Sequence, residues 1–445
     1  MSDPATAPVI PAVALDSNLC AGRAGGPLPI PATWPLPELQ VGYPVEELAR
    51  EESHQPAELL PDLPVVPQGY ITPDCDPETG AVDWDTRRGS LSWLAHHQNV
   101  HGFWSAAGFA HNSCRAGALA THGSSDDSLG VEQADSGGAN ADLAVTSLAL
   151  LSYIGAGYDH KEGEFKRSCR EALKWLRKQQ DDVGFTCARG TRDHALATMA
   201  LCETYGLSGD QVFKPIAESA VQQLLKQRHS QSGWGEQVWG EADMISTTCA
   251  ILALKTARMS GLEVEYKLPG LGEYLDALAD DKGNIRYSHW RTTPYGSERE
   301  GFTRGPVCAA AWMLSALLTG HCGLNDPRIK ACAALLTQES NLPAWQRGRI
   351  DLEYWWLGSL AMYQQGGTPW EAWEKAMTTA LLDNQRGFTE LDKKRRWTDA
   401  RKLDEHGSWD AEDVWNDDGR VSTTALASLC LEVYYRLRRT YQRLE

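Results

Sequence analysis

Two kinds of apolar helix pattern alternate along most of this chain, and their alternation restricts the folds that it can adopt. One kind carries a single apolar stripe with charged residues between, as in 163–180 and 211–228, which predicts a helix with one face in water. The other kind is apolar or small on all sides, as in 141–155 and 243–260, which predicts a helix enclosed by protein. A shell of one-sided helices around a set of enclosed helices satisfies both patterns.

The alternation repeats about every 50 residues. Asp142, Asp193, Asp243 and Asp351 each open an enclosed segment, at spacings of 51, 50 and 108 residues, the last being twice 54. Six pairs of one outer and one inner helix close most simply into a ring, although an open superhelix of helix pairs uses the same units. We therefore predict an all-α fold, a single (α/α)6 toroid. The expected helices are 87–99, 141–155, 163–180, 192–206, 211–228, 243–260, 268–280, 303–320, 326–339, 351–365, 369–384 and 420–441.

The first 85 residues differ from the rest in their proline content. Fifteen of the 22 prolines lie before residue 85, which excludes a long helix or a central strand there. We expect residues 1–85 to form an extended, proline-rich arm that lies on the body or on a protein partner, or else a flexible tail. Residues 86–445 are expected to form the toroid.

Charge and cysteine usage exclude several classes of partner. The formal net charge of −17 argues against a surface that binds nucleic acid or an anionic membrane. No apolar run reaches the roughly 18 residues that a membrane span needs, and no secretory signal precedes the body. The eleven cysteines show no CxxC spacing, so we expect reduced core cysteines and a cytoplasmic protein.

Several segments resemble a known family. Gln98-Asn-Val-His-Gly-Phe-Trp104, 180–185 and 227–234 each place a glutamine at the end of an outer helix, followed by glycine and an aromatic residue. This pattern is similar to the QW repeat of squalene-hopene cyclases and protein prenyltransferase β-subunits. Segments 193–206, 354–363 and 419–435 resemble the bacterial prenyltransferase/squalene-oxidase repeat proteins. The resemblance covers residues 86–445 and implies a toroid of the terpenoid-cyclase type; it transfers architecture better than chemistry.

In a closed toroid the starting ends of the inner helices meet at one opening, where acidic residues have two interpretations. They cap helices and meet the positive end of the helix dipole, or they crowd together so that one carboxyl stays protonated and acts as a general acid. His194 is the best single titratable candidate, although a histidine there can equally be a packing residue. The candidate catalytic residues are Asp193, His194, Asp243, Asp351, Asp417 and Asp418.

Tryptophan is frequent, with 17 residues, and its positions suggest two roles. Trp104 and Trp234 fit the repeat pattern and are expected to join neighbouring repeats. Other aromatic residues fit it less well and could stabilise a carbocation by cation–π attraction or stack on a sugar. The candidate substrate-binding residues are Trp239, Tyr354, Trp355, Trp356 and Trp415.

Three functional hypotheses follow, and the sequence leaves open whether the chain is an enzyme. The first is a cyclase-like toroid that binds or cyclises an apolar polyprenyl substrate by carboxylic-acid protonation. The chain lacks the Asp-x-Asp-Asp motif of class II terpene cyclases and the Asp-x-Cys zinc ligands of prenyltransferases, so neither metal nor cofactor is expected. The second is a non-catalytic toroid that binds a protein partner through its opening and its arm. The third is a glycan-processing (α/α)6 enzyme.

Overall fold

The computed structural model describes residues 86–112, 135–181, 184–186, 188–237, 240–264, 268–387 and 405–433. All of them belong to one unit, Pro37–Glu445, and the predicted arm at 1–85 lies outside them. The described residues form twelve α-helices, the short 3-10 helix η3 (Phe109–Asn112) and one hairpin of two short strands.

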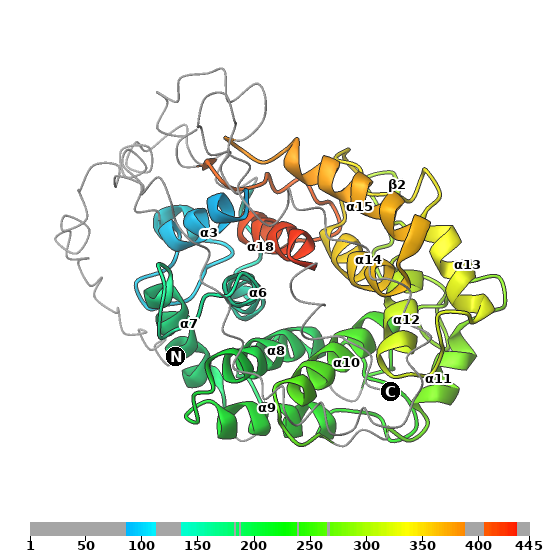
Figure 1. The fold of residues 1–445 in the computed structure, drawn as a ribbon, viewed down its shortest axis with the longest axis horizontal. Coiled ribbons are helices and arrows are strands. Elements are labelled where there is room, and N and C mark those ends of the chain that lie inside the picture. The colour runs from blue at the N-terminus through cyan, green and yellow to red at the C-terminus, as the bar shows by residue number, and fades with distance from the viewer. Residues whose placement is uncertain are drawn as a thin grey trace, which may run out of the picture. The chain divides into compact units, whose positions relative to one another are not determined.

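Six inner helices form a closed ring. Each packs against the next one in the chain, and the last packs against the first (Figure 1). Ser152 Oγ donates a hydrogen bond to the carbonyl oxygen of Ala425 across this closure, at 3.1 Å. The predicted (α/α)6 toroid is therefore confirmed. The inner helices are α6 (Asp142–Gly155), α8 (Thr191–Ser208), α10 (Met244–Met259), α12 (Val307–Leu318), α14 (Leu352–Gln365) and α18 (Gly419–Leu431).

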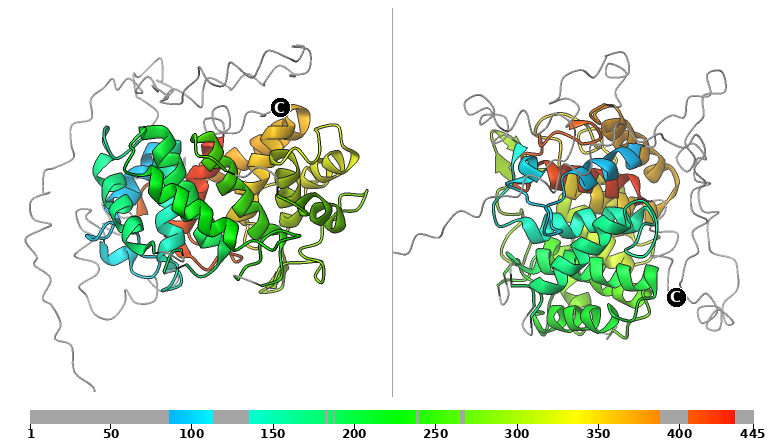
Figure 2. Two further views of the ribbon diagram at one scale, coloured as in Figure 1. Left: turned by 90° about the horizontal axis from the view of Figure 1, so that it is seen from below. Right: turned by 90° about the vertical axis from the view of Figure 1, so that its left-hand side faces the viewer.

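Six outer helices surround the ring (Figure 2). In the outer helix over 166–179, Cys169, Leu173 and Leu176 are buried while the basic residues between them face solvent. The inner helices are buried on nearly all sides, as the alternating pattern predicts. The outer helices are α3 (Thr86–His96), α7 (Lys166–Gln179), α9 (Lys214–Lys226), α11 (Leu271–Leu278), α13 (Pro327–Leu336) and α15 (Gly367–Leu382).

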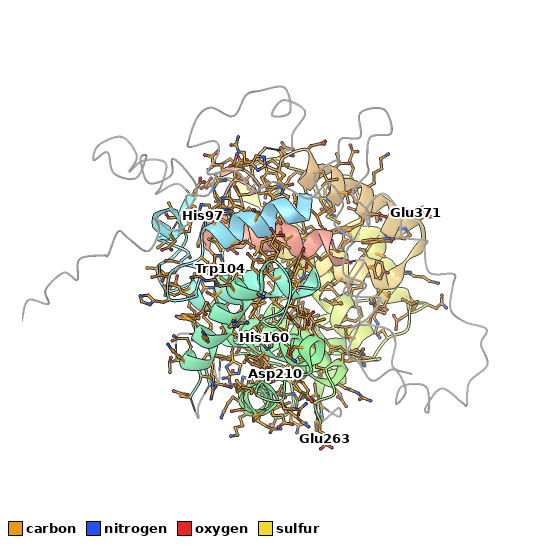
Figure 3. All side chains as sticks on the ribbon, turned by 60° about the vertical axis from the view of Figure 1, so that its left-hand side comes forward. His97, Trp104, His160, Asp210, Glu263 and Glu371 are labelled. Carbon is orange, nitrogen blue, oxygen red and sulfur yellow. The ribbon has the colours of Figure 1, made fainter. Side chains whose placement is uncertain are left out.

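Tryptophans join three of the six outer helices to the inner helices that follow them. The Trp104 indole donates to the carbonyl oxygen of Leu94 at 2.7 Å, and its backbone N–H donates to the Thr146 hydroxyl of α6 at 3.0 Å; Figure 3 labels Trp104. Trp234 repeats both contacts, with Leu224 and Thr247, and Trp409 repeats them with Leu381 and Thr424. The same joint therefore recurs around the ring.

All but one of the predicted helix starts lie within three residues of the observed ones, and one differs by four residues. The helix expected over 303–320 begins at Val307, because β1 (Glu298–Arg299) and β2 (Phe302–Thr303) pair as an antiparallel hairpin just before it. Glu300 and Gly301 form the turn with positive φ angles of 51° and 81°, as a two-residue hairpin turn requires. The last predicted helix starts as expected, but its predicted end at 434–441 lies outside the described residues.

Candidate functional site

The starting ends of the inner helices bring most of the predicted aspartates to one end of the ring. We call this end the mouth: the first turns of the inner helices and the segments that directly precede them. Asp243 and Asp351 are N-caps, and they accept backbone N–H groups of Ser246 and Tyr354 at 2.8 and 2.9 Å. Asp193 lies in the first turn of α8, and Asp418 directly precedes α18. All four side chains are buried.

Arg189 ties two of these aspartates together. Its Nε is 2.8 Å from Asp193 Oδ2, and its other guanidinium nitrogens contact Asp418 at 2.5 and 3.0 Å. The single planar guanidinium of Arg189 therefore makes bidentate contacts with both carboxylates. This contact joins the start of α8 to the start of α18.

The hairpin supplies a second arginine. Arg304 follows β2 directly, and its guanidinium contacts Asp351 at 2.5 and 2.9 Å and Glu353 at 3.1 Å. Asp413 lies beside this group, and its carboxylate accepts the backbone N–H of Leu352 at 2.9 Å. Burial, together with the charge of Asp351, raises the Asp413 pKa well above its usual range. The start of α14 therefore holds a cluster of carboxyl groups around one cation.

An ion pair crosses the mouth from one side of the ring to the other. Arg192 Nε of α8 is 2.9 Å from Glu353 Oε1 of α14, and two inner helices separate α8 from α14 in either direction around the ring. Burial alone would raise the Glu353 pKa, but the guanidinium groups of Arg192 and Arg304 hold it below its ordinary value. The Arg192 side chain keeps 29% of its surface accessible, so water enters the mouth down to this pair.

Asp243 differs from the other predicted catalytic aspartates in that no arginine pairs with it. Its side chain is 2% exposed, and Oδ2 has no well-formed hydrogen bond. Tyr274 and Tyr287 lie close to the carboxyl group. Burial raises the Asp243 pKa to about 7, against which the hydrogen bonds from Ser246 act only in part. This aspartate is the one predicted acid of the mouth that the structure leaves protonated near neutral pH.

Asp243 and Glu353 both influence the same two cysteine thiols. Both lie within electrostatic range of the thiols of Cys308, in the first turn of α12, and Cys249, in the second turn of α10. The mouth thus contains a carboxyl group that holds its proton and a carboxylate that stays ionised.

The predicted aromatic residues of α14 point in different directions. The Tyr354 hydroxyl donates to the carbonyl oxygen of Asn341 at 2.9 Å and its ring packs edge-on against Trp373 of α15. Trp355 is fully buried against Trp345. Trp356 lies one turn after Glu353 and so shares its face of the helix, and its buried indole nitrogen has no hydrogen-bond partner. Of these three residues, only Trp356 shares the face that carries the ion pair.

The remaining predicted residues lie apart from the ion pairs. The His194 ring packs between α8 and α9: Nε2 lies 3.1 Å from the carbonyl oxygen of Ala220, and the ring contacts Phe185. Burial lowers the His194 pKa, which keeps the ring neutral. Asp417 is 76% exposed and pairs with Arg299. The Trp415 indole donates to the carbonyl oxygen of Gly348 at 3.1 Å. Trp239 lies outside the described residues.

Sequence reasoning missed the arginines. Arg189 and Arg192 flank the predicted start of α8, and Arg304 precedes α12, so basic residues stand where a helix start normally favours acids. That mismatch is the signal that could have identified them. Among the described residues, no group of three histidine, cysteine or acidic side chains is arranged to hold a metal ion. None of the helices described here is long and apolar enough to cross a membrane.

Comparison with known proteins found distant likenesses among solved structures. No protein-family model matches the chain, and no curated protein sequence matches it. An inactive variant of the alpha-1,6-mannanase GH76A of Salegentibacter sp. HEL1_6, solved in complex with alpha-1,6-mannotriose, is 12% identical over 79% of this chain and 99% of its own, with a TM-score of 0.48. The type II terpene cyclase MstE from Scytonema is 12% identical over 80% of this chain and 98% of its own, with a TM-score of 0.41. At these identities the likeness concerns the toroid fold alone.

Proposed function

We propose that this protein is a general-acid enzyme that acts at the mouth on a hydroxyl-rich, glycan-type substrate, with Asp243 as the proton donor. The observation that carries this proposal is the buried Asp243 carboxyl, which has an unpartnered oxygen and no cation beside it. Glu353, clamped by two arginines, is the ionised partner. Two carboxyl groups whose surroundings separate their pKa values are the usual basis of acid and base roles in one site.

The polarity of the mouth favours a polar substrate. The accessible Arg192 and the paired carboxylates offer hydrogen-bond donors and acceptors to the hydroxyl groups of such a substrate. Asp243 would donate its proton to the glycosidic oxygen as its bond to the anomeric carbon breaks, and the Glu353 carboxylate would stabilise the positive charge that develops on the sugar ring. Water would then attack the anomeric carbon, and the proton that this water loses would restore the Asp243 carboxyl.

An exposed tryptophan at the rim of the mouth adds to this proposal. Trp290 is 83% exposed, and its backbone N–H donates to Glu241 Oε1 at 3.1 Å, two residues before Asp243. Tyr295, at 65% exposure, lies in the same segment with the Arg291 guanidinium 3.7 Å above its ring. Exposed aromatic rings beside polar side chains are suited to stacking on sugar rings, and large exposed apolar side chains mark binding surfaces.

A polyprenyl cyclase is the second candidate, and the surroundings of Asp243 favour it. Tyr274, Tyr287 and Cys308 shield this acid from water, as protonation of an alkene requires. Trp356, on the face of α14 that carries Glu353, could then contribute cation–π stabilisation. Membership of the prenyltransferase/squalene-oxidase repeat family, a cytoplasmic location and a protein partner for the arm stay predictions from the sequence.

The experiment compares both substrate classes on the full chain. Release of reducing ends from α- and β-linked oligosaccharides is measured in parallel with conversion of squalene and geranylgeraniol by gas chromatography and mass spectrometry. We expect turnover of an oligosaccharide, and a loss of at least 100-fold in D243N. Asp326→Asn is the matched control, because Asp326 caps the outer helix α13 in the same way.

The outcomes separate the candidates. Turnover of a polyprene that Asp243→Asn abolishes would replace the glycan proposal by the cyclase. Turnover that survives in Asp243→Asn would remove Asp243 as the acid. Absence of turnover on both panels would favour the non-catalytic binding role.

A further inference from the structure

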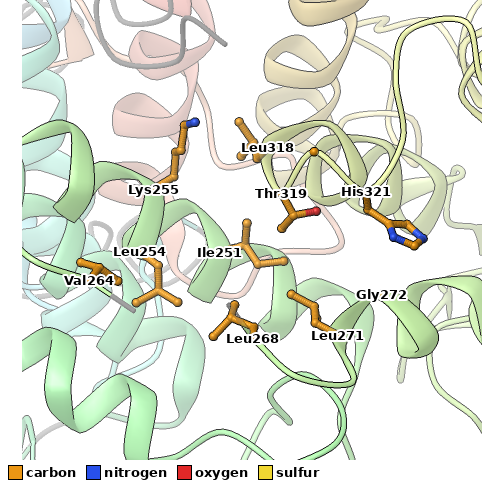
Figure 4. A pocket seen from close by; sticks show the side chains of 11 residues that line it. Ile251, Leu254, Lys255, Val264, Leu268, Leu271, Gly272, Leu318, Thr319 and His321 are labelled. Carbon is orange, nitrogen blue, oxygen red and sulfur yellow. The ribbon is translucent and has the colours of Figure 1, made fainter. Parts of the chain in front are cut away.

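A separate cavity of about 210 Å³ lies at the other end of the inner helices (Figure 4). It is formed where α10 and α12 end and where α11 begins. Its walls are mainly aliphatic. They include Ile251 and Leu254 of α10, Leu268 and Leu271 at the start of α11, and Leu318 at the end of α12.

Lys255 brings an amine into this apolar wall. The residue is 6% exposed, and among the described residues no carboxylate pairs with it. Burial, with a smaller contribution from the charge of Arg258, lowers the Lys255 pKa to about 8. A buried ammonium group without a counter-ion is costly, and a partner of opposite charge relieves that cost.

The carboxylate that contacts the cavity wall through His321 is engaged elsewhere. His321 lines the cavity, and its Nε2 lies 2.8 Å from Asp276 Oδ1, an oxygen that also contacts Arg328 at 2.5 Å. Asp276 is therefore held by two partners on the outer surface of this region. The first turn of α11 adds a second positive feature, since Gly272 lines the cavity and the N-cap Gly270 offers no side-chain acceptor. The positive end of that helix and the Lys255 amine favour an anion.

We infer that this cavity is a binding site for a small apolar monocarboxylic acid, whose carboxylate pairs with Lys255 and whose hydrocarbon chain packs on the leucines of α10, α11 and α12. An apolar cavity of about 150 Å³ holds a molecule of the size of benzene, so this cavity fits an acid of about six to eight carbons. The pair of opposite charges leaves the occupied cavity neutral overall.

The test measures binding of hexanoate to the full chain by calorimetry, with 1-hexanol and hexylamine as ligands of the same length. We expect hexanoate to bind at least tenfold more tightly than hexanol, and hexylamine not to bind. Lys255→Met keeps the length of the side chain and removes its charge, so it should weaken hexanoate binding at least tenfold and leave hexanol binding equal or tighter. Lys226→Met, at an exposed lysine of outer helix α9, is the matched control and should bind hexanoate normally.

Three results would overturn the inference: equal affinity of the wild-type chain for hexanoate and hexanol, no binding of hexanoate, or unchanged hexanoate affinity in Lys255→Met. The first two need no variant, so the test stands even where Lys255→Met fails to fold. Asp243→Asn should bind hexanoate as the wild type does, because the mouth and the cavity lie at opposite ends of the inner helices. Failure of this inference is thereby separable from failure of the proposed function.

Discussion

At the residue scale, neighbouring cations decide what each acid of the mouth does. Asp243, Asp351 and Glu353 all occupy the starts of inner helices and all are buried. Arg304 and Arg192 keep Glu353 ionised, whereas Asp243 has burial without a cation. Two buried acids at the starts of inner helices therefore hold or release the proton according to the side chains beside them.

Replacement of Asp243 by asparagine should stabilise the protein at alkaline pH. The pKa of this carboxyl rises from an ordinary value of 3.8 to about 7 in the fold, so the folded chain binds more protons than the unfolded chain between these values. Stability therefore falls as the pH rises through this window, and the penalty is complete above about pH 7. Asparagine keeps the helix cap, so Asp243→Asn should gain on the order of 2–4 kcal/mol at pH 8.

Urea unfolding at pH 5 and pH 8 measures this effect. Asp326→Asn provides the opposite control, because hydrogen bonding from Arg328 lowers the Asp326 pKa to about 2, and its loss should destabilise the protein at pH 8. A lower stability of Asp243→Asn at pH 8 than at pH 5, each relative to wild type, would contradict the expected protonation of Asp243.

Replacement of Glu353 by glutamine should destabilise the protein because it removes a buried carboxylate that Arg192 and Arg304 share. Breaking one partner of a buried ion pair typically costs about 3–5 kcal/mol. The double variant Arg192→Met with Glu353→Met should recover part of this loss, since it removes both charges of the pair that crosses the mouth. Thermal unfolding of the single and double variants gives the coupling energy.

An exposed pair gives the reference for that measurement. Lys174 and Glu171 of α7 form an ion pair on the surface at 2.8 Å, and Glu171→Gln should change stability by less than about 1 kcal/mol. Equal effects of Glu353→Gln and Glu171→Gln would show that the Arg192–Glu353 pair is solvated like a surface pair.

At the element scale, periodicity identified the helices and left the hairpin undetected. The continuous apolar pattern around Val307 and Leu318 correctly predicted an inner helix. The strand segments are only two residues each and carry a glutamate and an arginine, so no alternating pattern could reveal them. The two arginines that the hairpin positions, Arg299 and Arg304, were missed for the same reason.

Gly358 of α14 tests how closely an inner helix approaches its outer partner. A Cβ atom at this position would lie 2.4 Å from Cζ2 of Trp373, in α15. Gly358→Ala should therefore destabilise the fold by about 1–3 kcal/mol through overpacking, and Gly358→Leu by more. Gly108→Ala is the control, because its Cβ would meet only the Ser105 side chain, at 3.3 Å or more.

Thermal unfolding measures both substitutions. A Gly358→Ala variant as stable as wild type would mean that α14 and α15 can separate without loss, which would contradict the tight packing of Trp373 and its hydrogen bond to Ser359 at 2.9 Å.

At the scale of the whole molecule, the ring closes where two segments far apart in the chain touch through glycines. A Cβ atom on Gly137 would lie 2.3 Å from the carbonyl carbon of Asp418, and the N–H of Gly138 donates to the carbonyl oxygen of Asp417 at 2.9 Å. Gly137→Ala should therefore destabilise the fold and displace Asp418 from Arg189, whereas Gly138→Ala meets only Asn140 at 3.3 Å. Thermal unfolding of both variants measures the difference, and equal stability would contradict a rigid closure.

The closure of the ring was predictable from the number of helix pairs, but the contacts across the ring were not. Arg192 and Glu353 are 161 residues apart, and Arg189 and Asp418 are 229 apart. Helical periodicity specifies which face of each helix is apolar, and it carries no information on which polar ends meet once the ring has closed. The acids of the mouth were therefore predictable as a group, and their partners were not.

The contact between Arg192 and Glu353 has a consequence for any molecule that would enter between the starts of α8 and α14. Such a molecule would have to separate these two side chains. An anion could take the place of Glu353 on the guanidinium, and a cation could take the place of Arg192 on the carboxylate. An uncharged molecule would leave Arg192 without an ionic partner, so entry at this point would depend on electric charge.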